Sequence, residues 1–219
     1  MLKEPGMHYI CEVKKASPSK GVIAEEFPYL EIAKEYEAAG AEAISCLTEP
    51  KTFPREKTNI CRKIVKEVTI PVLRKDFTVD EYMIYEAKVL GASAVLLICA
   101  ILDRDTIARY IKICDTLGLS ALVEVHDEME MQDAIQAGAR VIGVNNRNLK
   151  DFTVDIGNSL RLRGQAPEDI LFVAESGIKT AEDIQALKKA HVNGVLIGET
   201  LMRSSDKKKC LQELDADEI

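Results

Sequence analysis

Short apolar runs alternate with longer amphipathic stretches along the whole chain. The stretch 29–39 carries apolar residues at the spacing of one helical face, with Glu and Lys between them, and Gly40 follows it. The run 94–98 shows no alternation, which is typical of a strand buried on both faces of a parallel sheet. The pattern predicts strands at 8–13, 43–47, 70–75, 94–98, 121–125, 140–144, 170–174 and 194–198, and helices at 29–39, 60–68, 80–90, 103–117, 127–137, 157–163, 180–189 and 206–214.

Glycines at positions 40, 91, 118 and 138 each separate a predicted helix from the next strand. Eight strands alternating with eight helices indicate an α/β protein built as a (β/α)8 barrel. No linker or composition shift divides residues 1–219, so we expect a single domain. A doubly wound open sheet normally carries a glycine-rich phosphate loop after an early strand. Here the first strand ends in Glu12-Val-Lys-Lys15, which disfavours that alternative.

The composition narrows the class of protein. The chain has 219 residues, 47% of them hydrophobic, which is enough for a full core, and its net charge of −7 does not suggest a nucleic-acid partner. The longest apolar run, 94–102, is too short to span a bilayer, and no signal peptide is visible. Cysteines at 11, 46, 61, 99, 114 and 210 form no CxxC pair and read as reduced thiols. We therefore expect a cytoplasmic protein that binds a small molecule and no membrane.

Charged and amide side chains stand at the carboxyl ends of the predicted strands, where a barrel has its active site. Alternation along the first strand puts Glu12 and Lys14 on the same side. The strand-end set is Glu12, Lys14, Glu49, Lys51, Lys75, Glu124, Asn145, Arg147, Glu175, Ser176, Gly198 and Glu199. One such residue could be a solvated charge or could stabilise the barrel. So many favour a site in which lysines and carboxylates tune each other for acid–base chemistry.

Glycines after the last two strands indicate a phosphate site. Ser176-Gly177 follows the seventh strand and Gly198-Glu199 the eighth, where barrels commonly hold a phosphoryl group with backbone N–H donors. Glycine lets the backbone approach an anion closely, although either glycine could equally serve a tight turn. Ser17 and Ser19 could add hydroxyl donors, and Lys20 a positive charge.

The histidines do not suggest a metal site. His126 directly precedes Asp127, which can cap a helix. We therefore expect His126 to help cap that helix or to support the site residues, and not to act in catalysis. His8 and His191 have no partner at a ligand spacing, and the chain contains no HxH or HExxH pattern. We therefore predict no metal.

Six segments at the strand ends form a sequence pattern. They are Glu12-Val-Lys-Lys-Ala-Ser-Pro-Ser19, Pro71-Val-Leu-Arg-Lys-Asp-Phe77, Leu122-Val-Glu-Val-His-Asp127, Gly143-Val-Asn-Asn-Arg-Asn-Leu149, Ala174-Glu-Ser-Gly-Ile178 and Leu196-Ile-Gly-Glu-Thr-Leu-Met-Arg203. Taken in order, these segments resemble indole-3-glycerol-phosphate synthase. The resemblance implies a (β/α)8 barrel of tryptophan biosynthesis without metal or organic cofactor. Such an enzyme converts 1-(2-carboxyphenylamino)-1-deoxyribulose 5-phosphate into indole-3-glycerol phosphate, carbon dioxide and water. Other enzymes of the tryptophan pathway would be its candidate partners.

The resemblance also implies roles for individual residues. Lys75 matches the general acid of ring closure, and Lys14 a group that holds the substrate carboxylate or donates a proton. Glu124 matches the candidate base, and Glu12 a carboxylate that orders the lysines. Asn145 and Arg147 match residues that position these groups, and Phe53 matches an aromatic residue that packs on the anthranilate ring. The positions that match the substrate and phosphate pocket are Ser17, Glu175, Ser176, Gly177, Gly198 and Glu199.

The chain departs from the family pattern in two places. The family usually carries an N-terminal helical extension of several dozen residues, whereas the first strand is expected here within ten residues of Met1. The loop after the second strand usually reads Phe-x-Gly-Ser but here reads Phe53-Pro-Arg-Glu56, so the glycine and serine that follow the aromatic residue in the family are replaced.

Two other readings stay open. Phosphoribosylanthranilate isomerase would share the phosphate end of the barrel, but its chemistry needs one acid and one base rather than two lysines with several carboxylates. A barrel that binds the ligand without turning it over is the alternative from a different class. Every matched catalytic position keeps its expected side chain, so the synthase is favoured.

Overall fold

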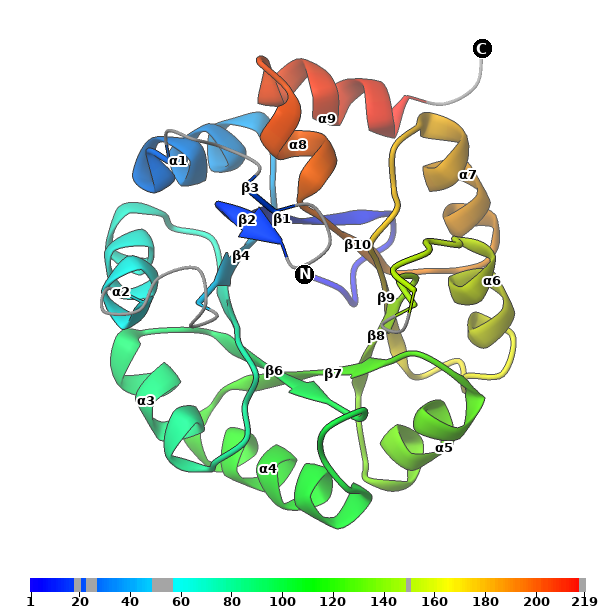
Figure 1. Cartoon of the computed structure of the whole chain (residues 1–219). Helices are drawn as coiled ribbons and strands as arrows, with labels where there is room; N and C mark the ends of the chain where they lie inside the picture. Colours follow the sequence, from blue (N-terminus) through cyan, green and yellow to red (C-terminus); the bar gives the residue numbers. More distant parts are fainter. Residues whose placement is uncertain (18–20, 23–26, 49–56, 149–150, 217–219) are drawn as a thin grey trace.

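The computed structural model describes residues 1–17, 21–22, 27–48, 57–148 and 151–216. Within that part of the chain, eight parallel strands close into a barrel surrounded by helices (Figure 1). The strands are β1 (His8–Val13), β4 (Ala43–Leu47), β5 (Val72–Lys75), β6 (Ala94–Ile98), β7 (Ser120–Val125), β8 (Val141–Asn145), β9 (Leu171–Glu175) and β10 (Gly194–Ile197). The first strand, β1, pairs with both β4 and β10, which closes the ring. The (β/α)8 prediction is confirmed.

The helices follow the strands in the predicted order. They are α1 (Tyr29–Ala39), α2 (Lys57–Glu67), α3 (Tyr82–Leu90), α4 (Arg104–Leu117), α5 (Glu128–Gln136), α6 (Gly157–Arg163), α7 (Ala181–Lys189), α8 (Glu199–Arg203) and α9 (Lys207–Asp215). The Asp127 side chain accepts from the backbone N–H of Glu130 at the start of α5, and Thr180 forms a capping box at the start of α7. Helices α1, α3 and α4 end at glycines 40, 91 and 118 in the left-handed conformation.

Two apolar layers hold the barrel together. The larger layer fills the space between the strands and the surrounding helices. The smaller one fills the barrel interior and contains Ile10, Leu73, Leu96, Leu122, Val173 and Leu196, one from each of six strands. Leu2, near the amino terminus, packs against this inner cluster beside Gly194, at the amino end of β10. That end of the barrel is therefore covered, and the opposite end is left for a site.

Three short elements were not predicted from the sequence. Strands β2 (Ala16–Ser17) and β3 (Gly21–Val22) pair antiparallel in a segment expected to be a loop. Helix α8 begins right after Gly198, where the eighth strand was expected to end and where no helix was expected before residue 206, and it buries Leu201 and Met202. A strand of two residues is too short to show alternation, and a helix of five residues is little more than one turn, so neither gives a recognisable pattern.

The six cysteines are free thiols, as predicted. Cys11, Cys46, Cys61 and Cys114 are buried, and burial raises the pKa of Cys11 above its ordinary value. None of the helices in the described ranges combines the length and apolar character needed to cross a membrane.

Candidate active site

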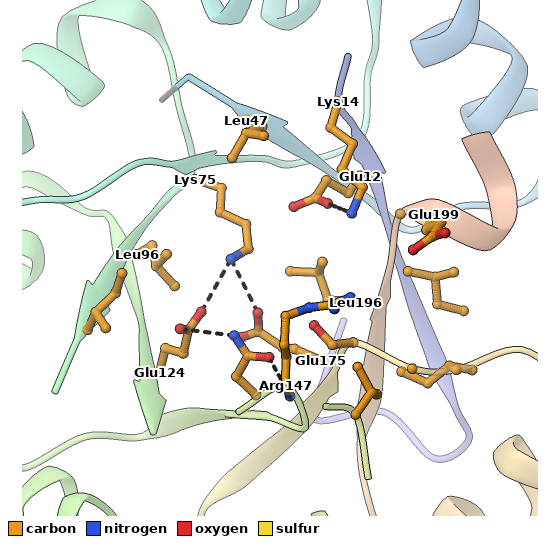
Figure 2. Close-up of a pocket in the computed structure, with 18 of the residues that line it drawn as sticks. Glu12, Lys14, Leu47, Lys75, Leu96, Glu124, Arg147, Glu175, Leu196 and Glu199 are labelled. Atoms are coloured by element: carbon orange, nitrogen blue, oxygen red, sulfur yellow. Dashed lines mark hydrogen bonds and ion pairs between the residues drawn. The ribbon is translucent and has the colours of Figure 1, made fainter. Parts of the chain in front are cut away.

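The open end of the barrel holds a cavity of about 650 Å³ at the carboxyl ends of the strands. Figure 2 shows Lys75, Glu124 and Glu175 pointing toward one another inside it. Its lining includes eleven of the residues predicted from the sequence: Glu12, Lys14, Lys75, Glu124, Asn145, Arg147, Glu175, Ser176, Gly177, Gly198 and Glu199. Phe53 lies outside the described residues, and the side chain of Ser17 is not described.

The two-residue period of the strands delivers these side chains to the cavity. Leu73 belongs to the inner cluster, so Lys75, two positions later on β5, projects to the same side one step nearer the open end. The same relation connects Leu122 with Glu124 on β7. Apolar side chains therefore fill the middle of the barrel, and charged side chains line the cavity at the carboxyl ends of the strands.

Lys75 is the centre of the charged cluster. Its Nζ lies 3.3 Å from Glu124 Oε2 and 3.4 Å from Glu175 Oε2. Burial alone would lower the pKa of Lys75, but Glu124, Glu175 and Glu12 outweigh it and raise that pKa above its ordinary value. Lys75 is therefore a protonated ammonium group at neutral pH, facing the cavity.

Glu124 is held as a carboxylate although only 4% of it is exposed. Burial would raise its pKa, but Lys75 and His126 lower it to about 2. The Asn145 amide also contributes, because its Nδ2 donates to Glu124 Oε1 at 3.2 Å. Asn145 is in turn fixed by its own Oδ1, which accepts from the backbone N–H of Arg147 at 3.0 Å. Three side chains thus contact this carboxylate, and the backbone of Arg147 fixes one of them.

The pKa of Glu175 is shifted in the opposite direction from that of Glu124. Burial, together with the negative charges of Glu124 and Glu12, raises its pKa to about 7 in spite of Lys75. Its Oε1 atom is buried without a hydrogen-bond partner among the described residues and faces Gly143, where a Cβ would collide with it. The glycine on β8 therefore makes the space that this carboxyl group occupies. Two adjacent carboxyl groups with separated pKa values are typical of acid–base sites.

Glu12 and Lys14 form a second pair across the cavity from this cluster (Figure 2). Lys14 Nζ lies 2.7 Å from Glu12 Oε2. Burial opposes ionisation of Glu12, but Lys14 and Lys75 lower its pKa below the ordinary value. Gly198 provides the room for the pair, since a Cβ there would lie 2.5 Å from Glu12 Oε2 and 2.6 Å from Lys14 Nζ.

The turn after β9 has an unusual backbone. Ser176 has φ 67° and Gly177 has φ 85°, and the first of these is a conformation that residues other than glycine rarely adopt. A Cβ at Gly177 would collide with Val154, so the glycine is required for the close approach of the two loops. Strain of this kind is concentrated at functional sites.

Several cavity residues were missed by the sequence reasoning. The cavity is also lined by Phe77, Ile101, Phe152, Val154, Lys179, Thr200 and Arg203. Phe77 is 46% exposed, so an apolar side chain lies at the rim without being covered by the core. Arg203 Nε lies 3.1 Å from Glu199 Oε1, which compensates the charge of Glu199. Phe77 directly follows the Lys75-Asp76 strand end, and that position could have marked it.

His126 lies beside the charged cluster. Its ring lies between Glu124 and Glu130. Within the described ranges, no group of three or more His, Cys, Asp or Glu side chains is arranged to hold a metal ion.

A comparison with protein families gives the decisive observation. The family model described as indole-3-glycerol phosphate synthase matches residues 2–214. The chain belongs to the indole-3-glycerol phosphate synthase family. Members of that family from Ruminiclostridium cellulolyticum and Lachnoclostridium phytofermentans are 62% and 56% identical to it, covering 94% and 98% of this chain and 78% and 79% of theirs.

A solved structure shows the same fold at low sequence identity. Thiamine phosphate pyrophosphorylase from Pyrococcus furiosus superposes with a TM-score of 0.69 and 20% identity, over 95% of this chain and 93% of its own. That likeness supports the barrel architecture. The sequence relatives define the family.

Proposed function

We propose that this chain converts 1-(2-carboxyphenylamino)-1-deoxyribulose 5-phosphate into indole-3-glycerol phosphate, carbon dioxide and water. The observation that carries the proposal is Lys75, an ammonium group within 3.4 Å of Glu124 and Glu175 at the mouth of the barrel. The reaction needs an acid for a carbonyl oxygen, a base for a later proton removal, and a cavity that excludes water. Membership of the synthase family supports the same assignment.

The cavity has two chemically different sides for the two ends of this substrate. Gly177 and Gly198 supply backbone without side chains, with Lys179 and Arg203 nearby as positive charges, and these suit the phosphate. The apolar rim side chain of Phe77 suits the aromatic ring. A substrate held at both ends presents its carbonyl group to the charged residues between them.

Ring closure uses Lys75 as the acid. The aromatic carbon that bears the carboxylate attacks the ketone carbon, a carbon–carbon bond forms, and the carbonyl oxygen takes a proton from the Lys75 ammonium group. The raised pKa of Lys75 keeps that proton available at neutral pH, and the developing alkoxide is a stronger base than the neighbouring carboxylates. The positive charge also stabilises the developing negative oxygen before the proton moves.

Loss of carbon dioxide and of water completes the reaction. The bond to the carboxyl group breaks and its electrons restore the aromatic ring. Glu124, held as a carboxylate, then removes a proton from the new five-membered ring, and the hydroxyl group leaves as water with a proton from Lys14. Glu12 holds Lys14 in place for this step, and Asn145 holds Glu124.

The test is conversion of the carboxyphenylamino-deoxyribulose phosphate by the purified chain, followed by the fluorescence of the indole product. Phosphoribosylanthranilate is the comparison substrate, since an isomerase of the same fold would consume it instead. We expect indole formation and no isomerisation. Calorimetric binding of the substrate without turnover would instead support the ligand-binding barrel and contradict the proposal.

A further inference from the structure

The His126 imidazole lies between two carboxylates at the end of β7. Its Nε2 is 3.3 Å from Glu124 Oε1, and its Nδ1 is 3.0 Å from Glu130 Oε2. A neutral imidazole carries one N–H, whereas the imidazolium carries two. Nδ1 is hydrogen-bonded to Glu130, whereas Nε2 lies at ion-pair distance from Glu124 without hydrogen-bond geometry. Two carboxylate oxygens within 3.3 Å of the ring nitrogens favour the charged imidazolium.

Glu130 fixes the orientation of this ring. Its Oε2 accepts from the backbone N–H of His126 at 2.8 Å as well as from Nδ1. Glu130 belongs to the first turn of α5, where its own N–H donates to the capping side chain of Asp127 at 2.9 Å. On the other side, Asn158 Nδ2 donates to the His126 carbonyl at 3.0 Å. The imidazole is thus attached to the helix as well as to the strand.

We propose that His126, anchored by Glu130, is a positively charged positioning residue that fixes the carboxylate of Glu124 and keeps it ionised. Its significance for catalysis rests on the proposed function, in which Glu124 is the base. Glu124 Oε2 faces Lys75, and Oε1 faces both Asn145 and His126. Without the imidazolium, Glu124 Oε1 keeps the neutral amide of Asn145 as its donor. Lys75 is then the cation that still contacts this carboxylate, which lies close to Glu175 and Glu12.

The electrostatic surroundings support this assignment. The charged groups that face the ring are Glu124 from β7 and Glu130 from α5, and Lys75 from β5 lies on the far oxygen of Glu124. Burial lowers the pKa of His126, but the two carboxylates outweigh it and raise that pKa to about 9. The bridge is therefore charged across the physiological pH range, and it behaves as a fixed cation rather than a switch.

The first experiment observes the ring directly by NMR titration of the histidine side chains. The chain has three histidines, so the spectrum of His126→Asn assigns the signal. We expect the wild-type ring to stay protonated at pH 7.5 and the pKa to fall by about one unit or more in Glu130→Gln, since one opposite charge within hydrogen-bond distance is removed. A wild-type pKa at or below about 6.5 would overturn the proposal.

The second experiment measures kinetics as a function of pH. In His126→Asn we expect kcat to fall about ten- to a hundredfold, with KM within twofold, because a misplaced base affects the chemical step rather than binding. The acid limb of the kcat profile moves to higher pH, since Glu124 loses a positive neighbour, and Glu130→Gln moves it the same way by less. His191→Asn is the matched control at an exposed position, and we expect it to leave kcat and the acid limb of the pH profile unchanged.

The two experiments separate the possible failures. Unchanged kcat and an unchanged acid limb in both His126→Asn and Glu130→Gln would contradict a positioning role, provided that circular dichroism shows folded variants. Should His126→Asn fail to fold, Glu130→Gln decides, because it retains the imidazole. A wild-type chain without turnover would refute the proposed function, whereas the ring titration would still decide whether the charged bridge exists.

Discussion

Replacing Gly198 by alanine tests whether the Glu12–Lys14 pair must keep its position. The new Cβ would lie 2.5 Å from Glu12 Oε2, 2.6 Å from Lys14 Nζ and 2.7 Å from Lys14 Cε. Ordinary contacts of a carbon atom begin near 3.4 Å, so the ends of both side chains must move by about 0.8 Å. The φ of Gly198 is −123°, so the substitution does not force alanine into the left-handed conformation.

The expected result is a loss of activity with little loss of stability. The colliding atoms are the far ends of flexible side chains, so the cost in unfolding free energy stays below about 2 kcal/mol. A displacement of this size between reacting groups lowers the rate of the chemical step about ten- to a hundredfold. Steady-state kinetics on the carboxyphenylamino-deoxyribulose phosphate give kcat and KM, and urea unfolding gives the stability.

Gly164→Ala is the matched control for this substitution. Gly164 is exposed at the end of α6, and the nearest atom to its Cβ would be the Arg161 carbonyl at 3.6 Å. The same chemical change there should leave kcat within twofold. A Gly198→Ala variant that also keeps kcat and KM within twofold would refute the placement of the Glu12–Lys14 pair in the reaction.

Three further predictions concern neighbouring parts of the molecule. Gly143→Ala displaces the Glu175 carboxyl group, so kcat should fall at least about tenfold, and an unchanged kcat would show that Glu175 has no fixed position in the reaction. Glu175→Gln should change the pH dependence of unfolding. The pKa of Glu175 in the folded chain, about 7, lies above the ordinary 4.5, so ionisation of this group opposes folding as the pH rises between these values. The free energy of unfolding of the variant, relative to wild type, should therefore increase over that pH range. Parallel urea-derived stability curves for variant and wild type would contradict the raised pKa. Thr180→Ala removes the capping box of α7 and should cost about 1 kcal/mol in chemical denaturation without changing kcat, whereas a loss of activity would place α7 in the site.

The barrel was predictable from the sequence because most of its strands and helices are long enough to show their own hydrophobic pattern. Each strand is a short apolar run, each helix shows one apolar face, and the glycines at 40, 91 and 118 mark the ends of three helices with the left-handed conformation that glycine permits. The short helix α8 and the pair β2–β3 were not predicted, since a helix of little more than one turn and strands of two residues show no repeated pattern.

The membership of the site was predictable, and its internal arrangement was not. Position at a strand end was enough to select Lys75 and Glu124, because parallel strands of a barrel end at one mouth. The sequence assigned Glu175 to substrate binding, while the structure also places it against Lys75 with a raised pKa. That pairing depends on the space left by Gly143 on the adjacent strand, a three-dimensional relation that spacing along the chain does not encode.

The central claim is that the ammonium group of Lys75 carries out the ring closure, and one comparison tests it most directly. Turnover of the carboxyphenylamino-deoxyribulose phosphate is measured for wild type, Lys75→Met and Lys208→Met, the last at an exposed position on α9. The account predicts indole formation by wild type and Lys208→Met, and a loss of at least about a hundredfold in kcat for a folded Lys75→Met. A folded Lys75→Met with kcat within tenfold of wild type would contradict it.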